Sequence, residues 1–165
     1  MRIVALLLIF PILGATSAQA AWESSLLPSG FVHESSLTKA TDRAAKEGKA
    51  VVVYYTRTQC PPCDALQSRL RKESVGAPYR DKYVFTAVWG SSMGNSEREQ
   101  YRNLYGVQGA PTWLFFTPAG GYLCTARGGF GSDEGGIKLH DAVQTLLVKD
   151  STMSSGPQDC ITRQQ

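Results

Sequence analysis

The sequence of 165 residues has room for one compact domain and little room for a second. Its content of 42% hydrophobic, 10% aromatic and 19% charged residues is typical of a globular protein and argues against a disordered, collagen-like or polytopic membrane chain. The formal net charge is only +3 and no run of like charges occurs, so the basic surface typical of a nucleic-acid-binding protein is not expected.

The first twenty residues have the pattern of a secretory signal. Arg2 precedes an apolar run from Ile3 to Leu13, and Ala18-Gln19-Ala20 has the small-x-small pattern that signal peptidase cleaves. A retained membrane anchor is the alternative, but this run is well short of the roughly 20 residues that span a bilayer. We expect residues 1–20 to be removed, leaving no membrane anchor, and we favour the periplasm over general secretion.

The mature chain is expected to begin with an arm, a helix and a strand. Residues 21–34 have no clear period and form the predicted N-terminal arm. Leu37, Ala40 and Ala44 then recur at helical spacing and Gly48 stands at the place of a C-cap. The β-branched and aromatic run 50–55 follows, which indicates a strand buried on both faces.

A pair of cysteines comes directly after this strand. From Cys60 onward, Cys63, Leu66 and Leu70 fall on one helical face, which predicts a helix that begins at the cysteine pair. Two consecutive prolines, 61 and 62, are tolerated there because N–H groups in the first helical turn have no intrahelical partner. A helix N-terminus stabilises a thiolate, so this pair is a candidate redox site.

The second half of the chain continues the alternation of strands and helices. Residues 83–89 are a strand candidate, and Ser96 with Glu99 predicts a capping box for a helix that ends at Gly106. Strands at 112–117 and 122–126 flank the turn residues 118–121 as a hairpin. A last helix is marked by Ile137, Val143, Leu146 and Leu147, and residues 150–165 form a polar, aperiodic tail. The order predicts a three-layer α/β sandwich with a mixed sheet over 35–149.

The Cys60-Pro61-Pro62-Cys63 motif after a buried strand, with Gly109-Ala110-Pro111-Thr112 ahead of the hairpin, resembles the thioredoxin family across residues 35–149. The resemblance implies that Pro111 is cis and faces the cysteines, and that backbone groups of Ala110 pair with a substrate peptide. It also implies that Cys60 is the nucleophile and Cys63 the resolving thiol. The expected activity is thiol:disulfide exchange, with protein thiols or disulfides and a membrane or soluble redox partner, and with no bound cofactor.

Two positions depart from cytoplasmic thioredoxins. Gln59 stands where they carry a tryptophan before the first cysteine, and Tyr54 stands where they bury an aspartate. The second departure leaves open how Cys63 is deprotonated. The fold does not fix the direction of electron flow, because members of the family range from reducing to strongly oxidising potentials.

Three alternatives remain for the cysteine pair. A zinc site needs two further ligands, and Cys124 and Cys160 do not form a second short-spaced pair. A Cu(I) chaperone is the main alternative in the binding class, although no nearby histidine or methionine suggests a third ligand. A redox-inert interaction domain with a bracing disulfide is the other.

The remaining cysteines predict a second disulfide. An oxidising compartment and an even cysteine count favour a structural bond between Cys124 and Cys160, which would anchor the polar tail. Free thiols, an intermolecular bond or electron relay to the active pair are the alternatives. The glycine-rich stretch 128–131 lacks the nucleotide-binding fingerprints, and we expect a bend beside the active site.

Overall fold

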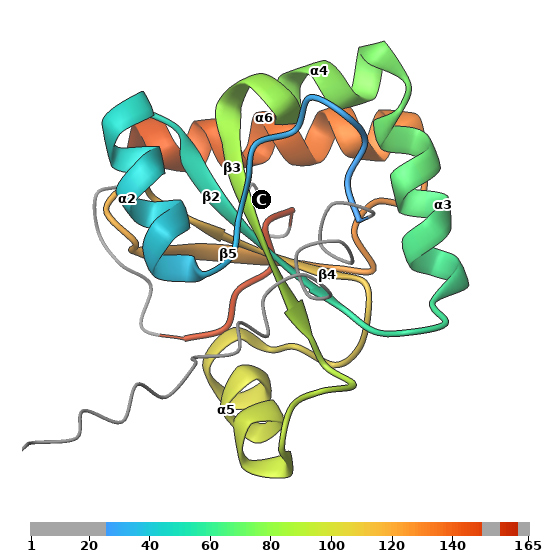
Figure 1. The fold of residues 1–165 in the computed structure, drawn as a ribbon. Helices are drawn as coiled ribbons and strands as arrows, with labels where there is room; N and C mark the ends of the chain where they lie inside the picture. The colour runs from blue at the N-terminus through green and yellow to red at the C-terminus, as the bar shows by residue number, and fades with distance from the viewer. Residues whose placement is uncertain (1–25, 150–155, 162–165) are drawn as a thin grey trace, which may run out of the picture.

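A computed structural model describes residues 26–149 and 156–161, so the expected signal peptide lies outside the described residues. Within them, five helices cover both faces of a five-stranded mixed sheet (Figure 1). The predicted three-layer α/β sandwich is confirmed. The elements in chain order are β1 (His33–Glu34), α2 (Leu37–Glu47), β2 (Ala50–Thr56), α3 (Pro61–Leu70), α4 (Glu73–Lys82), β3 (Tyr83–Trp89), α5 (Asn95–Tyr105), β4 (Thr112–Phe116), β5 (Tyr122–Arg127) and α6 (Asp133–Lys149).

The strand order β1-β3-β2-β4-β5 places β2 at the centre of the sheet. Strand β2 runs parallel to β3 and antiparallel to β4, and β4 and β5 form the predicted hairpin. All seven residues of β2 are buried because helices cover both sheet faces, which explains its continuous apolar sequence. The cysteine pair follows the carboxyl end of this central strand.

Alternate residues of β2 serve two separate core layers. Val52 and Tyr54 face the side covered by α3, α4 and α6, whereas Val51 and Val53 face the side covered by α2 and α5. Both cysteines of the pair lie in the first layer, together with Trp113 of β4. The active-site candidates are therefore built into the larger of the two hydrophobic layers.

Helix α4 is not predicted by the sequence pattern. Its apolar stripe consists only of Val75 and Tyr79, and Gly76 and Pro78 interrupt it. The glycine is needed because a Cβ at position 76 would clash with the carbonyl oxygen of Leu70 at the end of α3. The Tyr79 hydroxyl donates a 2.7 Å hydrogen bond to the carbonyl oxygen of Gly136, which ties α4 to α6.

The predicted capping box of α5 is wrong. The helix begins at Asn95 with Gly94 at the N-cap, and no side chain there makes a capping hydrogen bond, so Ser96 lies inside the first turn. Instead the guanidinium of Arg98 donates two hydrogen bonds, of 3.2 and 2.9 Å, to the carbonyl oxygen of Met93. A buried methionine and an arginine therefore fix the entry into this helix.

The N-terminal arm is more ordered than its sequence suggests. Leu26 and Leu27 are buried in the larger core layer, and β1 pairs in parallel with β3. A two-residue strand and two leucines leave no periodic signal, so sequence patterning does not find them. Helix α6 also begins four residues ahead of Ile137, because Asp133 and Glu134 occupy its first turn, a favourable place for carboxylates.

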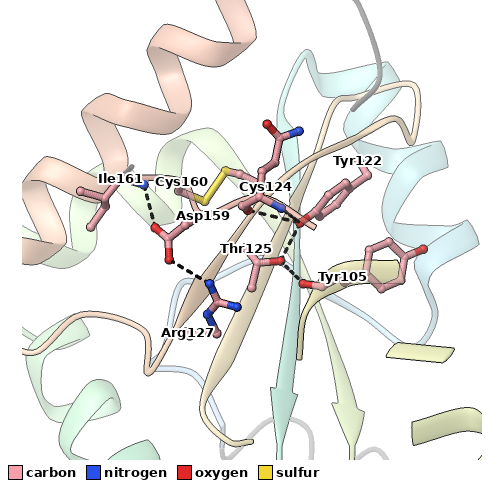
Figure 2. The surroundings of a disulfide bond; sticks show 9 residues. Tyr105, Tyr122, Cys124, Thr125, Arg127, Asp159, Cys160 and Ile161 are labelled. Atoms are coloured by element: carbon pink, nitrogen blue, oxygen red, sulfur yellow. Dashed lines mark hydrogen bonds and ion pairs between the residues drawn. A yellow bond between two sulfur atoms is a disulfide. The ribbon is translucent and has the colours of Figure 1, made fainter. Parts of the chain in front are cut away.

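The tail residues 156–161 lie along the outer edge of β5 (Figure 2). The Thr125 N–H donates to the carbonyl oxygen of Gln158 at 2.8 Å, and the Cys160 N–H donates to that of Thr125 at 3.0 Å. Cys160 forms a disulfide with Cys124, with a Cα–Cα distance of 4.9 Å, and both residues are fully buried. The structure thus contains the expected second disulfide, and the tail covers a sheet edge.

His140 of α6 is half-buried. Its Nδ1 atom lies 3.3 Å from the Tyr83 hydroxyl, and its ring packs edge-on against Tyr79 and Tyr83. Burial lowers the pKa of His140 from its usual value, while neighbouring Asp141 raises it and Lys82 lowers it further. The neutral imidazole is therefore the form that fits the folded protein.

This environment predicts a pH dependence of stability. The unfolded chain binds a proton at His140 more readily than the folded one, so the contribution of this residue is complete above about pH 6.5 and declines as the pH falls through the folded pKa. We expect His140→Gln to have a flatter stability profile than the wild type between about pH 7 and pH 5. Urea denaturation across that range measures it, and identical slopes would contradict the prediction.

Candidate active site

Cys60 and Cys63 form a disulfide at the N-terminus of α3, with a Cα–Cα distance of 5.2 Å. Cys60 is the N-cap residue, and Pro61 and Pro62 occupy the first two helical positions as predicted. The backbone N–H groups of Cys63 and Asp64 donate to the Cys60 carbonyl oxygen at 2.8 and 3.1 Å. Since the prolines have no N–H, the helix dipole is the main backbone contribution to a thiolate on Cys60.

The residue before the pair has an unusual backbone conformation. Gln59 has φ of 54°, the left-handed region that non-glycine residues rarely adopt and that is often found at functional sites. This conformation turns the chain from the end of β2 into α3 within a few residues. The sequence gives no sign of it, because glutamine is not a residue that marks such a turn.

Both sulfur-bearing residues are buried in the disulfide form. Cys60 is 5% exposed and Cys63 is 2% exposed. Access is through a cavity of about 560 Å³ beside the disulfide. It is lined by Leu26, Thr56, Arg57, Thr58, Gln59, Cys60, Cys63, Asp64, Gln67 and Trp89.

The cavity brings together residues that the sequence does not connect. Leu26 comes from the N-terminal arm and Trp89 from the end of β3, beside the end of β2. Arg57 and Asp64 supply charges of opposite sign near the cysteines. Parallel pairing of β2 with β3 is what places Trp89 here, since it aligns this residue with Thr56.

Two polar residues of β2 lie behind the disulfide. The Thr56 hydroxyl donates to the Cys63 Sγ atom at 3.5 Å, and Thr56 is fully buried. The Tyr54 hydroxyl is close enough to Thr56 to affect its own pKa, yet makes no hydrogen bond of normal geometry within the described part of the chain. Burial raises the pKa of Tyr54 above its usual value, so this phenol stays neutral.

The proposed peptide-docking residues lie immediately before β4. The Ala110–Pro111 bond is cis, Pro111 is buried, and Ala110 is partly buried against the core layer that contains both cysteines. The carbonyl oxygen of Pro111 accepts a 2.8 Å hydrogen bond from the Gly128 N–H. Neither Ala110 nor Pro111 is among the residues that line the cavity.

The glycine-rich bend packs against the active-site helix. Gly128 and Gly129 have φ of 73° and 62°, and a Cβ at Gly129 would lie 2.8 Å from the Leu66 side chain of α3. Glycine is therefore needed at 129 both for its backbone conformation and for its close approach to α3. The expected bend is present.

Among residues 26–149 and 156–161, no three His, Cys, Asp or Glu side chains come together as a metal site. No helix in the same ranges is long and apolar enough to cross a membrane.

Comparison with known proteins gives the family. The model of the thioredoxin-like domain matches residues 37–134, more than half of the chain. No curated protein sequence matches. Two similar solved structures are a thioredoxin from Thermus thermophilus (21% identity, TM-score 0.55, covering 74% of this chain and 91% of that one) and a disulphide isomerase from Xylella fastidiosa Temecula1 (19% identity, TM-score 0.55, covering 66% and 88%).

The chain therefore belongs to the thioredoxin-like family. At these identities the two structures show a shared fold only. The fold combined with a redox-capable cysteine pair at a helix N-terminus supports a thiol:disulfide oxidoreductase in general.

Proposed function

We propose that the protein exchanges disulfides with protein partners through Cys60 and Cys63 in an extracytoplasmic compartment, without a bound cofactor. The observation that carries the proposal is the Cys60–Cys63 disulfide at the N-terminus of α3, beside a cavity of about 560 Å³ that both cysteines line. A reactive sulfur at a helix N-terminus gains thiolate character from the helix dipole.

The proposed reaction has two thiol-exchange steps. In the reduced protein the Cys60 thiolate attacks a partner disulfide, which forms a mixed disulfide and expels one partner thiolate that takes up a proton. The Cys63 sulfur, after losing its proton, attacks Cys60 Sγ and expels the second partner sulfur. The protein ends as the Cys60–Cys63 disulfide and the partner as a dithiol, and the reverse sequence oxidises a partner.

Insulin reduction with dithiothreitol as the electron donor tests the activity, and metal analysis of the purified protein tests the alternatives. The oxidoreductase proposal expects catalysed precipitation of the insulin B chain and no stoichiometric metal. Copper at one equivalent without catalysis would favour the Cu(I) chaperone. No catalysis and no metal would favour a redox-inert domain.

Direction is set by the reduction potential of the Cys60/Cys63 pair relative to that of the compartment. Equilibration with glutathione buffers of known potential measures it. A potential below that of the partner makes the protein a reductant, and one above it makes the protein an oxidant.

An oxidising compartment is proposed from two features. The pattern of residues 1–20 is that of a secretory signal. Structural disulfides are typical of proteins outside the cytoplasm and rare within it. Cys124–Cys160 is a buried bond of this kind, which links the tail to β5. The periplasm is our proposal for the location, with general secretion as the alternative.

Processing after Ala20 gives a direct test. We expect the exported protein to begin at Ala21, because Ala18-Gln19-Ala20 is the small-x-small cleavage pattern. Intact-mass measurement of protein from the periplasmic fraction checks it. Ala20→Arg should block cleavage and leave the full-length chain with the membrane fraction, and a mature protein that still starts at Met1 would contradict the prediction.

A further inference from the structure

The resolving cysteine needs help to lose its proton, because it is buried. Cys63 is 2% exposed and lies in an apolar core layer, an environment that disfavours a thiolate. The charged groups that line the cavity are Arg57 and Asp64, and Asp64 directly follows Cys63 in α3. A thiolate at this position therefore needs a local hydrogen-bond donor.

The strand behind Cys63 carries no carboxylate. Tyr54 and Thr56 point to the same side of β2, toward α3, because side chains two residues apart share a sheet face. Tyr54 remains a neutral phenol, since burial raises its pKa. A neutral phenol at position 54 cannot accept the Cys63 proton as an ionised carboxylate there would.

Thr56 makes the direct contact. Its Oγ1 atom lies 3.5 Å from Cys63 Sγ and donates to it, and the residue is fully buried, so water does not compete for the hydroxyl. A hydrogen bond donated to a sulfur favours the thiolate over the thiol. The contact also limits where the Sγ atom of Cys63 can move when the disulfide opens.

We propose that Thr56 is the positioning residue for resolution: its hydroxyl holds Cys63 Sγ and donates a hydrogen bond to the Cys63 thiolate as that thiolate attacks Cys60. This inference rests on the proposed exchange reaction and assigns a role within it. No proton is transferred to threonine. The Cys63 proton leaves to solvent through the cavity, and the expelled partner thiolate takes up a proton from solvent.

The first test measures the Cys63 pKa without any catalysis. In a Cys60→Ala protein, Cys63 is the only free thiol, because Cys124 and Cys160 are linked. The ¹³Cβ chemical shift of cysteine reports its ionisation. A hydrogen bond to a charged group corresponds to roughly one pKa unit or more, so adding Thr56→Val should raise the Cys63 pKa by about one unit. Adding Thr56→Ser instead should restore the original value.

The second test measures resolution itself. Reduced protein is mixed with Ellman's reagent at low pH, where the mixed disulfide on Cys60 accumulates, and the pH is then raised. Release of the second equivalent of nitrothiobenzoate reports the attack by Cys63. A pKa higher by one unit lowers the thiolate fraction about tenfold but raises its nucleophilicity about threefold, so Thr56→Val should resolve about threefold more slowly at neutral pH.

The same argument predicts a crossover. Above both pKa values every Cys63 is ionised, and the more basic thiolate of Thr56→Val should then react about threefold faster than that of the wild type. A purely structural effect would slow the reaction at every pH. Unchanged Cys63 pKa in Thr56→Val, or a rate reduced equally across the pH range, would overturn the proposal.

These outcomes are independent of the physiological reaction. The titration needs only Cys63 and the resolution assay needs only the cysteine pair, so both remain informative if insulin is not reduced. Absence of insulin reduction by the wild type would contradict the proposed function. A Cys63 pKa that is the same with and without Thr56→Val would contradict only the role of Thr56. Thermal melts of the wild type, Thr56→Val and Thr56→Ser check that valine, which has the shape of threonine, leaves the fold intact.

Discussion

Replacing either cysteine of the active pair is expected to abolish multiple-turnover disulfide exchange, but with different trapped products. Cys60→Ser removes the nucleophile at the N-cap of α3, so no covalent intermediate forms and the rate falls to that of the uncatalysed exchange. Cys63→Ser keeps the nucleophile and removes only the resolving sulfur. This variant should accumulate up to one equivalent of mixed disulfide with its partner.

The asymmetry follows from the position of each residue. Cys60 lies at the helix N-terminus, where the dipole favours a thiolate, whereas Cys63 lies one turn inside and contacts Thr56. Non-reducing electrophoresis and mass spectrometry after exposure to a disulfide-containing protein measure the trapped species. The two variants are matched controls for each other, since both lose the same disulfide. Equal trapping by both would show that the roles are not divided in this way.

Much of the fold follows from sequence periodicity. The apolar sequence runs that form β2, β3 and the β4–β5 hairpin are long and bounded by turn residues, so the type and order of these elements are predictable. Helix α4 is the main omission, because Gly76 and Pro78 break its stripe and its stability comes from packing on α3 and α6. Tertiary contacts of this kind leave little local trace.

The candidate site also has a part that the sequence predicts and a part that it does not. The cysteines and the two prolines are found by sequence because their chemistry depends on a fixed spacing at a helix start. Thr56 is not, since its role depends on which face of β2 meets α3 and on a single interatomic distance. The alternation of side chains along β2 could have found it. Thr56 comes two residues after Tyr54 and therefore lies on the same face of the strand, and Tyr54 is the position where thioredoxins bury an aspartate.

The cavity residues Leu26 and Trp89 are also missed. They are brought to the cysteines by burial of the arm and by the β2–β3 register, and neither feature is encoded in a local pattern. The sequence correctly predicts a strand over 83–89, which includes Trp89, but it does not predict that this residue lines a cavity. In the structure it is only partly buried and lines the opening beside Cys60 and Cys63.

The second disulfide is expected to make a large contribution to stability. Cys124 and Cys160 are 36 positions apart, and in the chain-entropy model a bond that closes a loop of this length stabilises the folded state by about 4 kcal/mol. Without it, the tail would be held by a few hydrogen bonds and by the Arg127–Asp159 ion pair, whose N–O distance is 3.6 Å (Figure 2). Exposed pairs of this kind contribute little.

The bond should also resist reductant. Cys124 and Cys160 are both fully buried, whereas Cys60 and Cys63 border the cavity. Thiol attack requires access to a sulfur atom, so mild dithiothreitol should open Cys60–Cys63 first and leave Cys124–Cys160 closed. Peptide mapping after alkylation under graded reductant measures the order. Simultaneous opening of both bonds in folded protein would contradict it.

The stability prediction is tested with the double variant Cys124→Ala/Cys160→Ala. We expect a loss of about 4 kcal/mol in the free energy of unfolding and a fall of roughly 15 °C in Tm, measured by denaturant and thermal unfolding. Asp159→Asn is the matched control: it weakens the ion pair with Arg127 but keeps the covalent link, and should cost less than about 1 kcal/mol. A loss as small in the double variant as in this control would show that the tail is held by its non-covalent contacts along β5.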